Sequence, residues 1–365
     1  MIINRNTCES ELVLALSRYI GYTTGAYNIA RIADISSYFT KKSSLYEIEL
    51  SKIIQKGDSG IKSDYATGVI NYCCALGFIT RHTQGGRLAK LGVSSLGRAY
   101  CYACDRNLED FKKFLMLYSI LRNDGDIYLL LLSIMSDNPS LQGDKLHKKF
   151  LSETIKLRNR RIKWLRKVFP NHILRNKVAD KILWVQKSLK ERIPIKPKMD
   201  FARHHSTPRK GWAKEIGHIN QHGEISKTGE RILKSVVDEN EYFWIGPPKE
   251  CFEKLRIPKD LAKGPYSPVW NILRPNKEPC ESTDLFINDV SDYMIKAYPY
   301  LRLLNYNQAS LESVLPFIYY KESRSGVRLD ENELFNRIFS LKRKKFALMS
   351  KRSSIFGHYQ LRKTD

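Results

Sequence analysis

The stretch KSDYATGVINYCCALGFITR, Lys62 to Arg81, decides how the first part of this chain folds. Ser63 is a good helix N-cap, and apolar residues then recur at helical spacing, so the sequence predicts a helix that ends near Leu76. Gly77 suits the position after a helix end, and Phe78 begins a strand. The predicted buried face of the helix is Val69, Ile70, Cys73 and Leu76.

The sequence on either side of this stretch completes a small domain. Residues 47–55 (EIELSKIIQ) predict a preceding helix, and Gly57 to Gly60 predict the turn between the two helices. A turn at Gln84 to Gly86 and a strand from Arg87 to Val93 predict a β-hairpin. Ser94 or Ser95 would cap a last helix, SSLGRAYCYA. Two helices followed by a hairpin indicate a winged helix, which is a helix-turn-helix with a β-hairpin wing.

A second segment repeats the end of the first. The pair EIGHI and SKTGERI follows the same order as ALGFI and SSLGRAY, with a strand and a capped helix after the glycine. Thr207 is the expected N-cap of the second recognition helix, with Pro208 at its first position. Gly217 would end that helix, and Gly223 would form a turn. The expected core residues are Trp212, Ala213 and Ile216.

These patterns predict a mainly α fold with small β-hairpins, made of three tandem winged-helix domains. The domains are expected at 1–125, 126–240 and 285–365, with a linker rich in proline and aromatic residues at 241–284. The third domain has the weakest pattern. Its predicted elements are helices at 311–321 and 331–341 and wing strands at 346–349 and 358–361, joined by a basic loop.

The charge of the chain is strongly positive, with 62 Lys and Arg against 38 acidic residues in 365, or +24. Residues 145–198 contain 18 Lys and Arg but only 3 acids, which makes +15. Solvated helical faces usually mix both signs, so this segment predicts contacts with phosphate. Nucleic acid is the expected partner, and an anionic membrane surface is the weaker alternative. No stretch is apolar enough for a membrane span, and no secretory signal is evident.

Catalytic and metal motifs are not evident. Acidic residues near lysines, such as Asp144 before Lys145, do not form a nuclease metal site, and no Gly-rich phosphate loop ends in GK[ST]. His147 begins like an HxK phosphodiesterase motif, but Thr154 stands where an Asp is needed. Cys101 and Cys104 form a CxxC without a second pair, so buried thiols are favoured over zinc. We therefore expect no enzyme activity, no cofactor and no metal. The seven cysteines favour a reduced cytoplasm.

The predicted DNA contacts follow from the two recognition helices, the wings and the basic run. Arg209 is the first choice for guanine, because its guanidinium group can donate two hydrogen bonds to O6 and N7, and Asn71 could pair with adenine. For His204 and His205, which precede the second predicted helix, groove contact is favoured over a metal or general-base role. Base readout is expected from Lys62, Ser63, Asp64, Tyr65, Thr67, Asn71, Arg203, His204, His205, Ser206, Arg209, Lys210 and Lys214. Phosphate contact is expected from Arg81, His82, Arg87, Arg158, Arg160, Arg161, Lys163, Arg166, Lys167, Lys351 and Arg352.

GIKSDYATGVINYCCALGFITR with GVSSLGRAY resembles the first recognition subdomain of FokI-like type IIS restriction endonucleases. WAKEIGHI with SKTGERIL is similar to the second subdomain of that family, and the third segment resembles its third only in length and outline. The resemblance implies a DNA-recognition region of three winged helices. The nuclease domain of the family, with its Asp and Asp-x-Lys metal site, has no counterpart here, so the resemblance does not imply cleavage.

The sequence thus predicts a double-stranded DNA-binding protein, the recognition subunit of a restriction or phage-defence system with a separate protein effector such as a nuclease or an ATPase. A stand-alone transcription regulator or plasmid replication initiator is the first alternative, since these also use tandem winged helices. A metal-dependent nuclease with an unrecognised site is the second. RNA is a weaker choice of partner, because no aromatic stacking surface is evident outside the linker.

Overall fold

The computed structural model describes most of the chain before residue 240 and three short strands after it. The described residues are Ile20, 45–57, 63–82, 90–105, 107–168, 180, 183, 187, 198–238, Trp244, 308–310, 346–350 and 359–363. Helices account for most of them, and the strands form two small sheets. The predicted mainly α fold with small β-hairpins is therefore confirmed.

The chain divides into two compact units. Unit 1 comprises Met1–Asn28 and Tyr118–Val269, and unit 2 comprises Ile29–Leu117 and Trp270–Asp365. The division falls inside helix α6 (Glu109–Asp137), and so does the domain boundary that the sequence suggested after residue 125.

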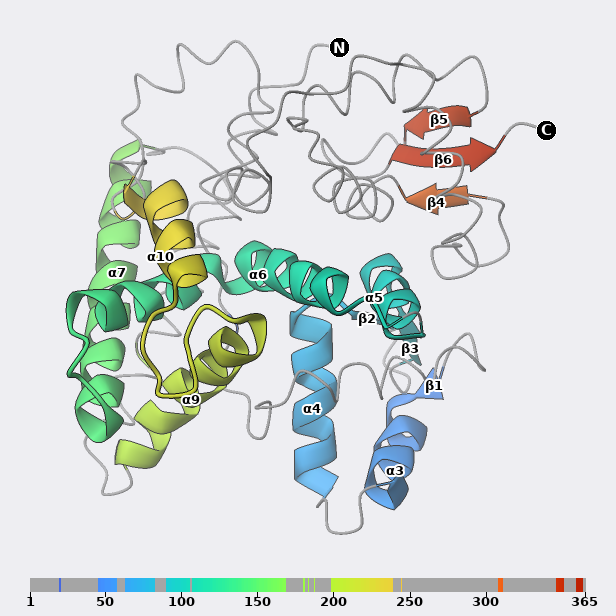
Figure 1. Ribbon diagram of the computed structural model, residues 1–365. Coiled ribbons are helices and arrows are strands. Elements are labelled where there is room, and N and C mark those ends of the chain that lie inside the picture. Colours follow the sequence, from blue (N-terminus) through green and yellow to red (C-terminus); the bar gives the residue numbers. More distant parts are fainter. Residues whose placement is uncertain are drawn as a thin grey trace. The chain divides into compact units, whose positions relative to one another are not determined.

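In unit 2, strand β1 (Leu45–Tyr46) leads into helices α3 (Glu47–Gly57) and α4 (Ser63–Ala75). Strands β2 (Ile79–His82) and β3 (Lys90–Val93) follow, and the sheet order is β1-β3-β2 with antiparallel pairs. α3 packs on α4 (Figure 1). The predicted helices and hairpin strands are thus confirmed. So is the predicted buried face, because Val69, Ile70 and Cys73 on α4 and Leu76 directly after it are at most 2% exposed.

A second sheet of unit 2 has the same strand order. It consists of β4 (Gln308–Ser310), β5 (Phe346–Ser350) and β6 (Tyr359–Lys363) in the order β4-β6-β5, again antiparallel. In both sheets the first strand pairs with the last, and the last two form adjacent antiparallel strands. β5 and β6 confirm the two strands predicted for the third segment at 346–349 and 358–361. The helices predicted there lie outside the described residues, as does the linker apart from Trp244.

In unit 1, helix α7 (Gly143–Val168) packs on α9 (Lys198–Ile216), and α10 (Lys227–Leu233) continues into a five-residue π-helix, Lys234–Asp238 (Figure 1). Residues 127–132 of α6 are buried on every side. A continuously apolar run does not show a helical period, which is why the sequence did not predict α6.

The start of α9 corrects the sequence prediction. The helix begins at Lys198, nine residues before Thr207, so Thr207 is not its N-cap and Pro208 lies in its interior. Proline removes a backbone hydrogen bond inside a helix. Next to it, the carbonyl of His205 accepts a hydrogen bond from Arg209 Nη1 at 2.6 Å.

The predicted repeat is present at atomic level in the helix ends and caps, beginning where α4 and α9 end. The strand predicted after Gly217 is wrong, because only a single antiparallel bridge between Ile219 and Ile225 forms there. Gly77 and Gly217 have φ of 78° and 93°, the left-handed conformation that favours glycine. The next residue in each case donates its N–H to the carbonyl five positions earlier, Phe78 to Cys73 at 3.0 Å and His218 to Ala213 at 2.7 Å. Both helices thus end in the same hydrogen-bonded glycine turn.

The serines that follow also occupy matching positions. Ser94 Oγ donates to the carbonyl of Gly77, and Ser226 Oγ to that of Gly217, each at 2.6 Å. The same hydroxyls accept the N–H of the residue three positions on, Gly97 at 2.9 Å and Gly229 at 3.1 Å. Each serine therefore caps one helix and ties it to the end of the preceding one. The helices so capped are α5 (Ser95–Asp105) and α10.

Candidate nucleic-acid interface

The outer face of α9 carries basic and polar side chains. Arg203 and Lys214 are exposed, and His204, Thr207 and Lys210 are half-buried. Positions 203, 207, 210 and 214 follow one another at helical spacing, so they share one face. Lys210 also reaches the turn after α9, because a Cβ on Gly223 would lie 3.2 Å from Lys210 Nζ. This face keeps four of the predicted readout residues available, namely Arg203, His204, Lys210 and Lys214.

Five predicted DNA contacts lie in the protein interior instead, and these predictions are wrong. A side chain that is at most 4% exposed cannot reach a groove or a phosphate. The five are Arg158, Arg161, His205, Ser206 and Arg209.

Buried aspartates explain why two of these arginines are inside. Arg209 donates Nε to Asp124 Oδ2 and Nη2 to Oδ1, both at 2.6 Å, and Arg161 Nη2 lies 3.1 Å from Asp126 Oδ2. Ile20 joins the first pair, because its N–H donates to Asp124 at 2.8 Å and its carbonyl accepts from Arg209 at 2.8 Å. A buried charge needs such partners, so the loss of either member of a pair would leave the other charge buried and uncompensated.

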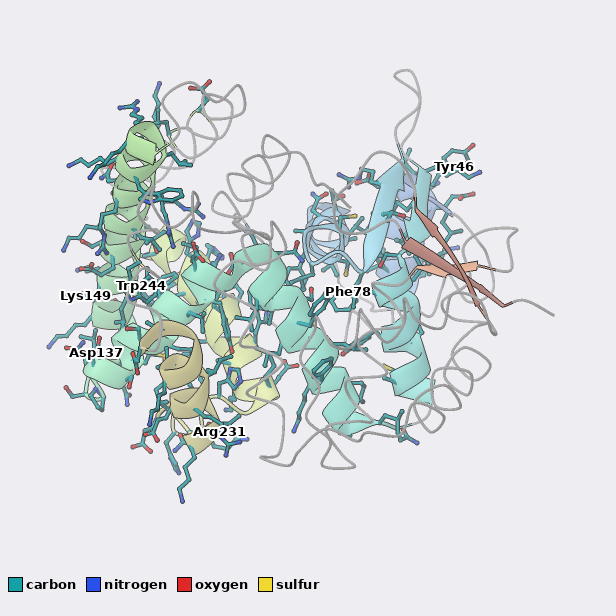
Figure 2. All side chains as sticks on the ribbon, turned by 90° about the horizontal axis from the view of Figure 1, so that it is seen from above. Tyr46, Phe78, Asp137, Lys149, Arg231 and Trp244 are labelled. Carbon is teal, nitrogen blue, oxygen red and sulfur yellow. The ribbon has the colours of Figure 1, made fainter. Side chains whose placement is uncertain are left out.

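The solvent face of α7 carries a long row of basic side chains. Asp144 is the one exposed acid on this helix, and Glu153 is half-buried and paired with Lys149 and Lys156. Lys149 points away from the helices (Figure 2). Eight exposed cations follow one another along this surface, which we call the α7 stripe: Lys145, Lys148, Lys149, Lys156, Arg160, Lys163, Arg166 and Lys167.

The α7 stripe runs along almost the whole of α7. From Lys145 to Lys167 the helix rises about 33 Å, which is close to one turn of B-DNA at roughly 34 Å. Four of the predicted phosphate contacts belong to it, namely Arg160, Lys163, Arg166 and Lys167. Its other four members come from the same basic run but were not singled out in the sequence.

In unit 2, the outer face of α4 is less basic. Asn71 is exposed and Thr67 is half-buried. Arg81 Nη2 on β2 donates to Asn71 Oδ1 and to Glu47 Oε1 on α3, each at 2.7 Å. Arg81 thus links the hairpin to both helices. Because its guanidinium is already paired with the carboxylate of Glu47, Arg81 is a weaker candidate for phosphate contact.

The remaining predicted contacts are not all described. The side chains of Ser63, Asp64, Tyr65 and His82 lie outside the described part of the chain, and so do Lys62, Arg87, Lys351 and Arg352.

Two acidic partners of the predicted contact residues were missed in the sequence. Asp144 lies 3.0 Å from Arg203, and Glu47 lies beside Arg81, yet both acids are distant in sequence from their partners. Sequence patterns report neighbours along one helix and not across two, so no local signal marks either pair.

The described residues form neither a metal-binding site nor a reactive thiolate at Cys73 or Cys74. No group of three or more His, Cys, Asp or Glu side chains among them could hold a metal ion. Cys73, Cys74, Cys101 and Cys104 are not joined in disulfides. Burial raises the pKa of Cys73 and of Cys74, so neither is a reactive thiolate at neutral pH.

Comparison with family models, curated proteins and solved structures gives no match for this chain. Among the helices that the structure describes, none is both long and apolar enough to cross a membrane.

Proposed function

We propose that the chain is a double-stranded DNA-binding recognition protein built from winged-helix domains. In this proposal it is the recognition subunit of a restriction or phage-defence system, and a separate protein effector such as a nuclease or an ATPase acts on the DNA. The α7 stripe is the observation that carries DNA binding. Eight cations lie on one face of one helix, with a single exposed acid beside them. This pattern favours a face that binds a polyanion over one that is only solvated.

The arrangement of unit 2 supports the winged-helix part of the proposal. A short strand, two packed helices and an antiparallel pair that returns to the first strand give the order β1-β3-β2. In a winged helix the second of those helices enters the major groove, and here that helix is α4. The matching turns after α4 and α9 support the same role for α9. The strand order β4-β6-β5 supports a third domain of the same kind.

The outer face of α9 supports readout by Arg203 and Lys210, as expected from the sequence, and adds Thr207, while the buried His205, Ser206 and Arg209 drop out. Arg203, Thr207 and Lys210 lie on its outer side, where a major groove would meet them. Arginine and lysine contact guanine through O6 and N7, and threonine contacts either base type or the thymine methyl group. This face therefore favours G-containing sites for unit 1.

The experiment that tests the proposal is selection from a random-sequence duplex DNA pool with Mg²⁺ present. Enrichment of one motif without cutting is the expected result, and copurification would then identify the effector. A palindromic or repeated motif bound by a dimer would favour a regulator or replication initiator instead. Cut DNA would favour a nuclease. Binding without any enriched motif would contradict sequence recognition, and no binding at low salt would contradict the proposal as a whole.

A further inference from the structure

A histidine, an arginine and a lysine gather where the first turns of α7 meet α9. His147 Nδ1 lies 2.5 Å from Ser206 Oγ, which anchors the half-buried ring to α9. Arg203 donates Nε and Nη2 to Asp144 Oδ1 at 3.2 and 3.0 Å, one turn before His147 on α7. Burial lowers the pKa of His147, Asp144 raises it, and Arg203 and Lys210 lower it further. All three charged groups therefore act on the same imidazole.

The hydrogen bonds of Ser206 determine which nitrogen of His147 carries the proton. Ser206 Oγ donates to the carbonyl of Ala202 at 2.9 Å, so its only hydrogen is used there. Its oxygen must then accept from His147, which makes Nδ1 the protonated nitrogen of the neutral ring. Nε2 is an acceptor in that state and repels an anion. Protonation turns Nε2 into a charged donor, which attracts one.

We propose that His147, Arg203 and Lys210 form a binding site for a phosphate group, in which Asp144 competes with the phosphate for Arg203. The inference deepens the proposed DNA-binding function and rests on it, because the same α9 face and the N-terminal end of the α7 stripe supply the residues. A backbone phosphate of duplex DNA and free inorganic phosphate share the required chemistry. Two basic groups and an imidazole suit a phosphate oxygen better than a metal ion, which they would repel.

The pH dependence of DNA binding tests the role of His147. Duplex affinity of the full chain is measured at pH 5.5 and 7.5 at one ionic strength, for the wild type and His147→Gln. Glutamine can still donate to Ser206 but cannot gain a charge. We expect equal affinities at pH 7.5 and about tenfold weaker binding of the variant at pH 5.5, since a charged hydrogen bond forms only in the protonated wild type. Equal weakening at both values would point to a structural role and overturn the inference.

A second test removes the competing carboxylate of Asp144 and is expected to raise the duplex affinity rather than lower it. Asp144→Asn removes the charge that holds Arg203 and repels the phosphate, so duplex affinity should rise about three- to tenfold at low salt. Glu230→Gln is the matched control, since it removes one exposed negative charge from α10 of the same unit. An equal gain in both variants would reflect net charge alone and overturn the inference, as would a loss in Asp144→Asn.

Inorganic phosphate distinguishes the two sources of the ligand and separates this inference from the proposed function. Thermal unfolding is followed in phosphate and in chloride at equal ionic strength, for the wild type and His147→Gln. Stabilisation of only the wild type by phosphate, without any duplex binding, would support the site and contradict the DNA function. Duplex binding that neither His147→Gln nor Asp144→Asn alters would support the DNA function and overturn the site.

Discussion

Arg209 and Asp124 form a two-pronged ion pair in the core of unit 1, with both N···O distances at 2.6 Å and both residues at most 2% exposed. The guanidinium carbon also lies 5.8 Å from the ring centroids of Phe150 and Trp212. Asp124 and Phe150 come from distant parts of the chain, whereas Trp212 lies one turn further along α9. The residue that the sequence marked as the best reader of guanine is therefore part of the core.

Removing one partner of this pair should destabilise the protein strongly. Arg209→Met leaves the carboxylate of Asp124 buried without its cation, so we expect the free energy of unfolding to fall by about 3–5 kcal/mol. The double variant Arg209→Met with Asp124→Leu removes both charges and should recover most of that loss. Urea unfolding measures both effects. A well-folded Arg209→Met variant that loses only its DNA sequence preference would contradict the buried role.

The matched serines and glycines predict matched costs in the two units. Ser94→Ala and Ser226→Ala each lose a cap and a second hydrogen bond, so each should cost about 1–2 kcal/mol. Gly97→Ala and Gly229→Ala should cost about 1–3 kcal/mol or more by overpacking, because the new Cβ would lie 2.2 Å from the carbonyl oxygen of Phe78 or 2.3 Å from that of His218. Thermal unfolding of the four variants checks this. A large cost in one unit and none in the other would contradict the repeat.

The features that the sequence predicted well depend on local chemistry. The turns at Gly77 and Gly217 and the caps at Ser94 and Ser226 each involve a few residues, whose types reveal the backbone conformation. The strands β5 and β6 were predicted for the same reason. The helix ends and hairpins of this chain are therefore readable from short stretches of sequence.

The burial of individual charged side chains was not predicted, although the spacing of residues on α9 indicated that of Arg209. Positions 205, 209, 212 and 216 recur at spacings of four, three and four, so they share one face with Trp212 and Ile216, which the sequence had already assigned to the core. That spacing would have placed Arg209 inside. Its partner Asp124 lies 85 residues away, and no local pattern indicates such a contact.

His218 should make the stability of unit 1 depend on pH. Its ring is 1% exposed, Nδ1 lies 2.8 Å from Tyr128 Oη, and burial lowers its pKa to about 4. The folded state therefore favours neutral His218, so its contribution is full above pH 6.5 and is lost as the pH falls toward 4. Between pH 7 and 5 this amounts to about 2 kcal/mol of the free energy of unfolding.

The correspondence between the glycine turns after α4 and α9 suggests a variant that tests the contribution of His218 to the pH dependence. Phe78 occupies the position of His218 in the other unit, so His218→Phe combined with Tyr128→Phe replaces the buried polar pair by apolar rings. Urea unfolding of the wild type and the double variant at pH 7 and 5 gives the difference. We expect the variant to lose about 2 kcal/mol less than the wild type on acidification. An unchanged pH dependence would show that other groups cause it.

Neutralising part of the α7 stripe should weaken DNA binding and reduce its dependence on salt. In the triple variant Arg160→Gln, Lys163→Gln, Lys167→Gln, three phosphate contacts are lost, so the slope of log K against log salt should become shallower by about 3. The matched control is Lys227→Gln, Arg231→Gln, Lys234→Gln, which removes three exposed cations from α10 and the π-helix after it. Arg231 is labelled in Figure 2. Because the two variants have the same net charge, an equal change in slope would assign the effect to total charge, whereas a change confined to the α7 variant would assign it to contact with the stripe.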